Sequence, residues 1–316
     1  MNTVGFIGSR DAGTVARTIL AKGECNLCIW QPDGAAEDAN ELPGEVVELD
    51  VLADIPLIII SARVHRFRSI ARRLGDIITG RHVIVHTTRG IEAETALTAS
   101  EILHQETPTR RTGFVTGPSR LDDLQAGRPS AAVCATHFPE VHELVEEAMM
   151  SPGFRIYRSR DLLGAELSAV YSRLLAIMSG LADGLQLGAS IQATLFARGL
   201  AEMSRFVVSR DGYEQTPFGL SGAGNLYVDT HQDGNIDFQM GQFLAKSPDD
   251  YSDDLVDNFD EPAQEILDIL AAFGEAEAEE EDLELYLFDA AQAIIEAQVP
   301  PAKVIQGLMT LPALYE

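Results

Sequence analysis

Roughly the first 150 residues alternate short apolar runs with amphipathic stretches, and this alternation limits the possible folds more than any other feature of the sequence. The runs are rich in β-branched residues and continuously apolar, as strands are when helices cover both faces of a parallel sheet. The pattern therefore predicts an N-terminal α/β domain with a doubly wound parallel sheet. We expect strands at 3–8, 26–30, 57–61, 82–87, 113–117, 130–136 and 154–159, with helices between them, among others at 12–22, 64–77 and 92–105.

After residue 160 the pattern changes to long helical periods, which predicts a second, all-helical domain. We therefore place one domain at 1–160 and the other at 161–316. A glycine-rich segment at 219–225 interrupts the helical pattern. We expect helices at 161–189, 191–209, 260–273, 283–297 and 301–309.

The net charge of −26 makes nucleic acid and anionic membranes poor partners, because both require a basic surface. The acidity fits either a salt-adapted protein or an arginine-rich composition with one acidic run at 275–284. No apolar stretch approaches the roughly 20 residues of a membrane span, and the N-terminus does not resemble a signal peptide. We expect a cytoplasmic protein whose partner is a small molecule.

Three cysteines, Cys25, Cys28 and Cys134, are too few for a disulfide framework. Cys25 and Cys28 form a C-x-x-C, but they open an apolar run that is typical of a strand. No second pair of cysteines or histidines has the spacing of zinc ligands. We therefore expect ordinary thiols and no metal site.

The first predicted strand ends in a turn that has the position of a dinucleotide-binding glycine turn. Gly8 can supply the tight bend and Gly13 the close helix packing of a Rossmann-like fold, while Arg10 replaces the glycine that normally approaches the pyrophosphate. Asp33 follows the second strand and can accept from a ribose hydroxyl, which slightly favours NAD over NADP. The alternative for Asp33 is a capping role in a Pro-Asp-Gly turn.

Further segments resemble the bacterial-type NAD(P)-dependent glycerol-3-phosphate dehydrogenases in the same order and over nearly the whole chain. The central segment at 174–206 is the most specific of them. The resemblance implies an N-terminal NAD(P) domain and an all-helical C-terminal domain of the 6-phosphogluconate dehydrogenase kind, with a possible homodimer through it. The similar segments are 5–16, 87–95, 116–131, 154–167, 174–206, 219–230 and 304–312.

Several positions depart from what the resemblance implies for catalysis. The family's catalytic lysine is Ser172 here, and a serine can neither tune its pKa toward neutrality nor stabilise an alkoxide by charge. A second family lysine is Arg89, which keeps the charge and can grip a phosphate or the nicotinamide side of the site. The family aspartate is Asn225. Asp237 stands where an asparagine meets the substrate phosphates, and a carboxylate there disfavours the same dianion.

Other polar residues remain as candidates. Gly117 and Ser119 can hold a substrate oxygen through the backbone and the hydroxyl. His86, Tyr171 and Arg173 are candidates for a displaced proton donor, although a histidine at a strand end is more often structural.

Three functions therefore stay open at this point. One is an NAD(P)-dependent oxidoreductase acting on an altered hydroxy or keto substrate. Another is a non-catalytic homologue that uses the two-domain scaffold for binding or regulation. The third is the unaltered family activity, which is less favoured because its lysine is absent.

Overall fold

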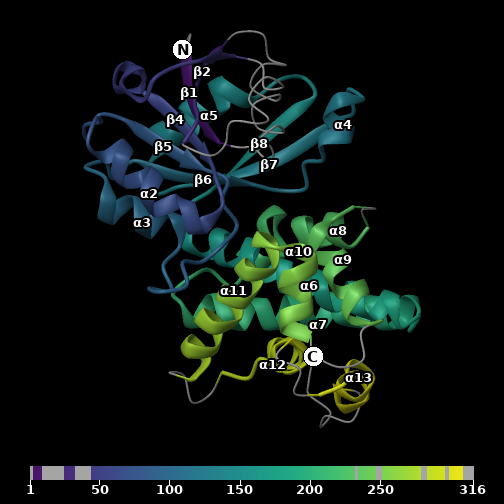
Figure 1. Cartoon of the computed structure of the whole chain (residues 1–316). Helices are drawn as coiled ribbons and strands as arrows, with labels where there is room; N and C mark the ends of the chain where they lie inside the picture. The colour runs from purple at the N-terminus through teal and green to yellow at the C-terminus, as the bar shows by residue number, and fades with distance from the viewer. Residues whose placement is uncertain are drawn as a thin grey trace. The chain divides into compact units, whose positions relative to one another are not determined.

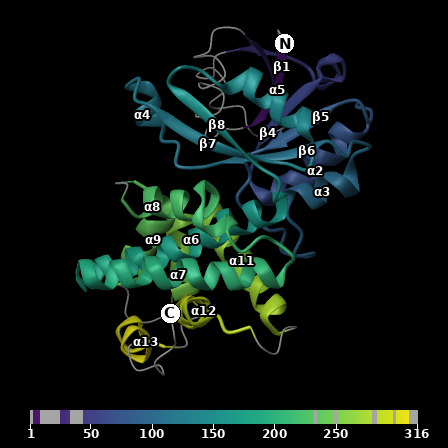
Figure 2. The ribbon, with the colours of Figure 1, turned by 180° about the vertical axis from the view of Figure 1, so that it is seen from behind.

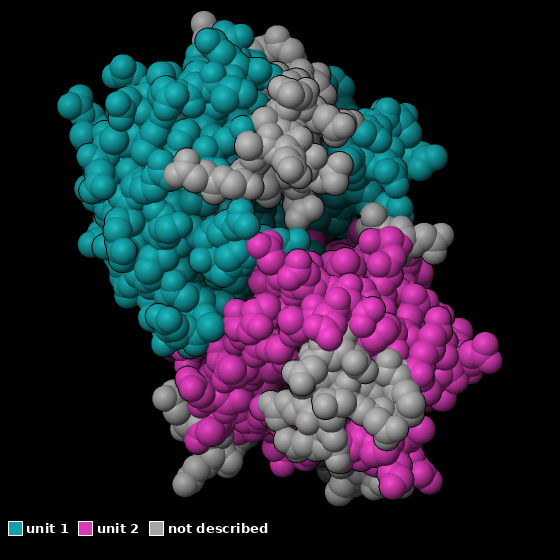
Figure 3. All heavy atoms as spheres, viewed as in Figure 1, with its two compact units in different colours: residues 1–166 teal, residues 167–316 magenta. Residues whose placement is uncertain are grey.

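The computed structural model describes residues 3–8, 25–32, 44–231, 234–246, 251–278, 283–295 and 299–308. The chain divides into two compact units, Met1–Glu166 and Leu167–Glu316 (Figure 3). We call them the sheet unit and the helical unit. The division falls within one long helix, α6 (Leu162–Gly184), which begins in the sheet unit and continues into the helical unit.

The described part of the sheet unit contains one eight-stranded sheet with the order β3-β2-β1-β4-β5-β6-β7-β8 (Figure 1). Neighbouring strands are parallel, except that β6 and β7 pair antiparallel. The predicted doubly wound sheet is confirmed, and β3 is a short edge strand that the sequence pattern did not predict. The strands are β1 (Thr3–Gly8), β2 (Asn26–Trp30), β3 (Glu45–Val46), β4 (Leu57–Ser61), β5 (Val83–His86), β6 (Thr112–Thr116), β7 (Ser130–Ala135) and β8 (Phe154–Ser159).

Helices cover both faces of this sheet, which explains why its strands are apolar at successive positions. In β4, Leu57 and Ile59 face the core that includes α5 (Pro139–Met149). Ile58 and Ile60 point to the opposite side, where the core includes α2 (Val64–Gly75) and α3 (Ala99–Glu106). Figures 1 and 2 show α2 and α3 on one side of the sheet and α5 on the other. Short η3 (Leu49–Asp54) and α4 (Leu121–Gln125) complete the unit.

Helix α3 is shorter than the helix predicted at 92–105, because a capping box fixes its first turn. The hydroxyl of Thr98 accepts a hydrogen bond from the Glu101 amide, and the Glu101 carboxylate accepts one from the Thr98 amide at 2.8 Å. A bridge between Ile91 and Thr98 closes the preceding turn. The residues before Thr98 are thus held outside the helix.

The helical unit packs around α6 and α7, with a core that includes the aromatic rings of Tyr171, Phe206 and Phe273. The predicted glycine-rich interruption contains a π-helical turn, η5. Besides α6, the described elements of this unit are α7 (Ala189–Ser209), η4 (Thr216–Phe218), η5 (Leu220–Gly224), α8 (Asn225–Thr230), α9 (Ile236–Leu244), α10 (Tyr251–Phe259), α11 (Glu261–Ala278), α12 (Tyr286–Ile295) and α13 (Pro301–Leu308).

Helix α6 is the one described helix whose length and composition would allow it to cross a membrane. Of its most apolar window, 94% is buried inside the protein. That degree of burial is typical of a core helix, because a central helix of a large core is apolar on all sides.

Candidate functional site

The carboxyl ends of β1 and β4 lie side by side at the point where the strand order changes direction. β1 lies between β2 and β4, so the chain builds one half of the sheet on each side of it. Gly8 ends β1 and is paired in register with Ser61, the last residue of β4. In doubly wound sheets, ligands bind outside the carboxyl ends of the strands at this switch point.

The loop after β5 is fastened to the same edge of the sheet. The hydroxyl of Thr87 donates a hydrogen bond to Oγ of Ser61 at 2.7 Å. A side chain at Gly90 would bring its Cβ within 2.9 Å of Cβ of Val64, so the loop lies tightly against the start of α2. Arg89 is half-buried between these anchored positions. The backbone of Arg89 is therefore held at the edge where Gly8 lies.

The turn after β6 continues this edge, because β5 and β6 are parallel neighbours. Gly117 has a φ of +143°, and a Cβ there would lie 2.9 Å from Cα of Ala132. Only glycine combines that conformation with that approach. The hydroxyl of Ser119 donates to the Ala131 carbonyl at 2.9 Å, so its proton is used to hold the turn against β7.

Three residues predicted to contact the cofactor, Arg10, Gly13 and Asp33, lie outside the described residues. Their roles stay predictions.

His86 is a core residue of the sheet unit. Its side chain is fully buried and stacks on Phe114 with ring centroids 4.9 Å apart. Its Nε2 lies 2.9 Å from Oγ of Ser100 and 3.2 Å from Oε1 of Glu166. Glu166 also accepts from the Ser100 amide and the Thr98 hydroxyl, which ties the start of α6 to α3. This burial leaves His86 no exposed surface for a substrate.

Ser172 and Tyr171 use their hydroxyl protons inside the helical unit. Ser172 is fully buried and donates to the Ala169 carbonyl of its own helix at 2.9 Å. Tyr171 is also fully buried and donates to Oε1 of Glu202 at 2.7 Å. Burial, together with the negative charge of Glu202, raises the pKa of Tyr171 well above its ordinary value. Neither hydroxyl is placed to protonate a substrate.

Arg173, the next residue along α6, is buried in contact with two carboxylates. Its Nε and Nη2 donate to both carboxylate oxygens of Asp237 at 3.0 and 3.1 Å, and its Nη1 donates to Glu265 at 3.1 Å. Burial opposes the charged guanidinium, but the two carboxylates outweigh burial and raise the pKa of Arg173. One cation and two carboxylates leave a net negative charge. A phosphate dianion would be repelled here.

Close backbone contact between α6 and α9 positions this cluster. A Cβ at Gly241 would lie 1.9 Å from the Ile177 carbonyl oxygen, and one at Gly180 would lie 2.0 Å from the Phe238 carbonyl oxygen. The side chain of Asn235 caps α9 by accepting from the Phe238 amide at 2.9 Å. These features fix the first turn of α9, which carries Asp237, beside α6.

Asn225 begins α8 and is buried. Its Nδ2 donates to the Ser221 carbonyl at 2.9 Å, across the π-helical turn. A Cβ at Gly222 would lie 2.1 Å from the Pro217 carbonyl oxygen, so the turn requires glycine there. The amide side chain thus stabilises the turn that precedes it.

The structure brings some of the predicted residues near one another in each unit. Gly8 ends β1, and Arg89 and Gly117 follow β5 and β6 at the same edge of the sheet. In the helical unit Asp237 lies against the neighbour of Ser172. Glu265 was not predicted, and it completes the charge cluster. No group of histidine, cysteine or acidic residues within the described ranges is arranged to hold a metal ion.

Comparisons with known proteins agree with this architecture. The model for the NAD-dependent glycerol-3-phosphate dehydrogenase C-terminus matches residues 161–306, and the model for the N-terminus matches residues 45–141. The N-terminal match does not include the glycine turn that begins at Gly8.

Individual relatives are also glycerol-3-phosphate dehydrogenases. The chain is 32% identical over 266 residues to the glycerol-3-phosphate dehydrogenase [NAD(P)+] of Sinorhizobium fredii, covering 84% of this chain and 77% of that protein. It is 32% identical over 243 residues to the enzyme of Moorella thermoacetica, covering 72% of each. Among solved structures, glycerol-3-phosphate dehydrogenase from Coxiella burnetii superposes with a TM-score of 0.85 at 23% identity, covering 98% of this chain and 99% of that one. That likeness shows a shared fold.

Proposed function

The chain belongs to the NAD(P)-dependent glycerol-3-phosphate dehydrogenase family, and from this premise we propose that it is an oxidoreductase for a hydroxy or keto compound other than the family's phosphorylated substrate. In this proposal the sheet unit binds the dinucleotide and the helical unit contributes to binding the substrate. The observation that carries the proposal is the buried cluster of Arg173, Asp237 and Glu265.

In this proposal a nicotinamide dinucleotide binds at the carboxyl edge of the sheet. Gly8 and Ser61 lie at the switch point, where a cofactor of this kind binds in doubly wound folds. When bound, such a cofactor would donate a hydride to a keto compound in its reduced form or accept one from a hydroxy compound in its oxidised form. The guanidinium of Arg89, held by its loop, has the charge and the donors to grip an anionic group at this edge. We propose NAD rather than NADP, because Asp33 follows β2 in the sequence, and a carboxylate that meets the ribose there would repel a 2′-phosphate.

The altered substrate is supported by the residues at the positions of the phosphate site. Asp237 engages Arg173 through both carboxylate oxygens. The preceding residue, Ile236, is 41% exposed and adds an apolar surface rather than a cation. A dianion would lose its hydration here and would meet a guanidinium, Arg173, that Asp237 and Glu265 already engage. An uncharged or singly charged compound would not incur this cost.

A second candidate function, binding without catalysis, has its own supporting observation. Ser172, at the lysine position, donates within its helix. The hydroxyl of Tyr171 and the guanidinium of Arg173 are equally engaged inside the helical unit. If no other group donates a proton, the protein can bind a nicotinamide cofactor without converting any substrate.

The test combines cofactor binding with turnover. NADH fluorescence measures binding, and absorbance at 340 nm follows NADH oxidation with a panel of 2-keto acids and ketoses, in low and molar salt. We expect binding and turnover of at least one compound, with turnover abolished in Arg89→Met. The control Arg81→Met changes an exposed arginine before the amino end of β5 and should behave as wild type. Binding without any turnover would favour the second function, and no binding would refute the proposed oxidoreductase.

A further inference from the structure

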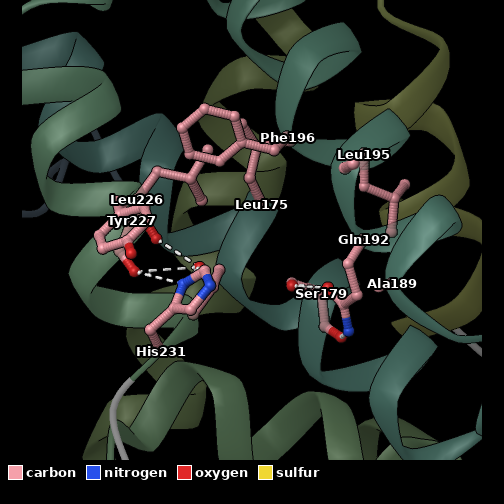
Figure 4. A pocket seen from close by; sticks show the side chains of 11 residues that line it. Leu175, Ser179, Ala189, Gln192, Leu195, Phe196, Leu226, Tyr227 and His231 are labelled. Carbon is pink, nitrogen blue, oxygen red and sulfur yellow. Dashed lines mark hydrogen bonds between the residues drawn. The ribbon is translucent and has the colours of Figure 1, made fainter.

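A cavity of about 350 Å³ lies within the helical unit, between α6, α7 and α8 (Figure 4). Leu175, Phe196 and Leu226 give it apolar walls. None of its lining residues is lysine, arginine, aspartate or glutamate. A charged ligand would enter unpaired and lose its hydration, so the cavity suits an uncharged molecule.

His231 and Tyr227 form one side of the cavity, and Ser179 and Gln192 lie on the other (Figure 4). The rings of Tyr227 and His231 stack with centroids 4.3 Å apart, and both side chains are exposed. The cavity therefore has a polar, accessible rim above an apolar floor. A concave site with few polar groups is the usual form of a small-molecule site.

The hydrogen bonds of His231 determine which of its nitrogens carries the proton. Its Nδ1 lies 2.9 Å from the Tyr227 carbonyl oxygen, which can only accept. The Thr230 hydroxyl, 3.0 Å from the same nitrogen, donates to carbonyl oxygens of α8. Nδ1 therefore donates, and Nε2 of the neutral ring carries a lone pair. Among the described residues nothing donates to this Nε2.

The polar groups opposite His231 already satisfy each other. The Ser179 hydroxyl donates to Oε1 of Gln192, and Nε2 of Gln192 donates to the Ser179 carbonyl at 2.9 Å. Nε2 of His231 is thus an acceptor at the rim that can take a hydrogen bond from a ligand.

We propose that this cavity binds a small uncharged alcohol, whose hydroxyl donates to Nε2 of His231 and whose apolar body contacts the apolar walls. This site goes beyond the proposed dehydrogenase function, because it requires neither the cofactor nor the sheet edge.

The test uses cyclohexanol and cyclohexanone as probes, titrated into the full chain without cofactor at alkaline pH and followed by saturation-transfer NMR. The two probes match in size, but only the alcohol can donate. We expect cyclohexanol to bind with a Kd on the order of 1 mM and cyclohexanone about fivefold more weakly. His231→Phe keeps an aromatic ring and removes the acceptor, so it should abolish this preference.

A matched pair of variants locates the binding. Ala193 lines the cavity, whereas Ala197, one turn further along α7, does not, and both are exposed. Ala193→Phe should remove binding of both probes, and Ala197→Phe should leave it unchanged, with equal far-UV circular dichroism. Equal binding to both variants, no binding to wild type, or no preference for the alcohol would overturn the proposal. So would an oligomer, seen by light scattering, that only Ala193→Phe dissociates, because a second copy would then occupy the cavity.

Discussion

Replacing Asp237 by asparagine tests whether this carboxylate belongs to the protein's own charge cluster or is available to a ligand. Asp237 accepts two hydrogen bonds from the guanidinium of Arg173, and both side chains are buried. The asparagine has the same shape, but it carries no charge and has one carbonyl oxygen in place of two. Its amide group would point N–H groups at a guanidinium that only donates.

The magnitude follows from these contacts. Each hydrogen bond to a charged group contributes about 1.5–3 kcal/mol, and the substitution replaces two of them by one weaker bond. Glu265 continues to neutralise Arg173, so the loss stays below the ~3–5 kcal/mol of a fully broken buried pair. We expect Asp237→Asn to lower the free energy of unfolding by about 2–4 kcal/mol.

Urea unfolding followed by far-UV circular dichroism measures this change. The control is Asp257→Asn, which alters an exposed aspartate of α10 and should shift the free energy of unfolding by less than about 0.5 kcal/mol. Raising the salt concentration should not remove the effect of Asp237→Asn, because a buried pair is weakly screened. A stability equal to wild type would refute the pairing and make Asp237 a candidate ligand contact again.

Three other predictions concern stability. Burial and a neighbouring carboxyl group of α12 raise the pKa of Glu277 to about 7. Because the folded protein holds this proton more tightly than the unfolded chain, the stabilisation by protonated Glu277 is fully present below pH 4.5 and is lost as the pH rises through 7. Glu277→Gln should flatten that pH dependence in urea titrations, whereas Glu275→Gln should not. Thr98→Ala removes the cap of α3 and a hydrogen bond to α6, and should cost about 1–2 kcal/mol in the same assay. Gly241→Ala should lower the free energy of unfolding by about 3 kcal/mol or more, because its Cβ would overlap the backbone of α6. Gly274→Ala is the control inside α11: its Cβ would lie at ordinary contact distance, so this change should raise the free energy of unfolding by about 0.5–1 kcal/mol.

The strands of the sheet unit were predictable because each one is marked by a short, continuous run of apolar residues. Burial on both faces makes a strand such as 57–61 continuously apolar, and the structure has β4 over the same residues. The start of α3 was missed because the sequence between 92 and 98 keeps an amphipathic pattern, while the Thr98 capping box decides where the helix begins.

The charge cluster was not predictable, because its partners are far apart in the sequence. Arg173 is 64 residues from Asp237 and 92 residues from Glu265, and no periodic pattern links them. The sequence alone suggested a substrate role for Asp237 and a proton-donor role for Arg173. Tertiary packing of α6 against α9 and α11 instead pairs them with each other.

The most direct measurement compares dihydroxyacetone phosphate with unphosphorylated dihydroxyacetone as substrates for NADH oxidation, at equal concentrations in low and molar salt. If the buried cluster rejects a dianion, the phosphate should confer no advantage in kcat/KM. A preference for dihydroxyacetone phosphate of more than about a hundredfold would contradict the account, because such discrimination requires a site built to pair with the phosphate.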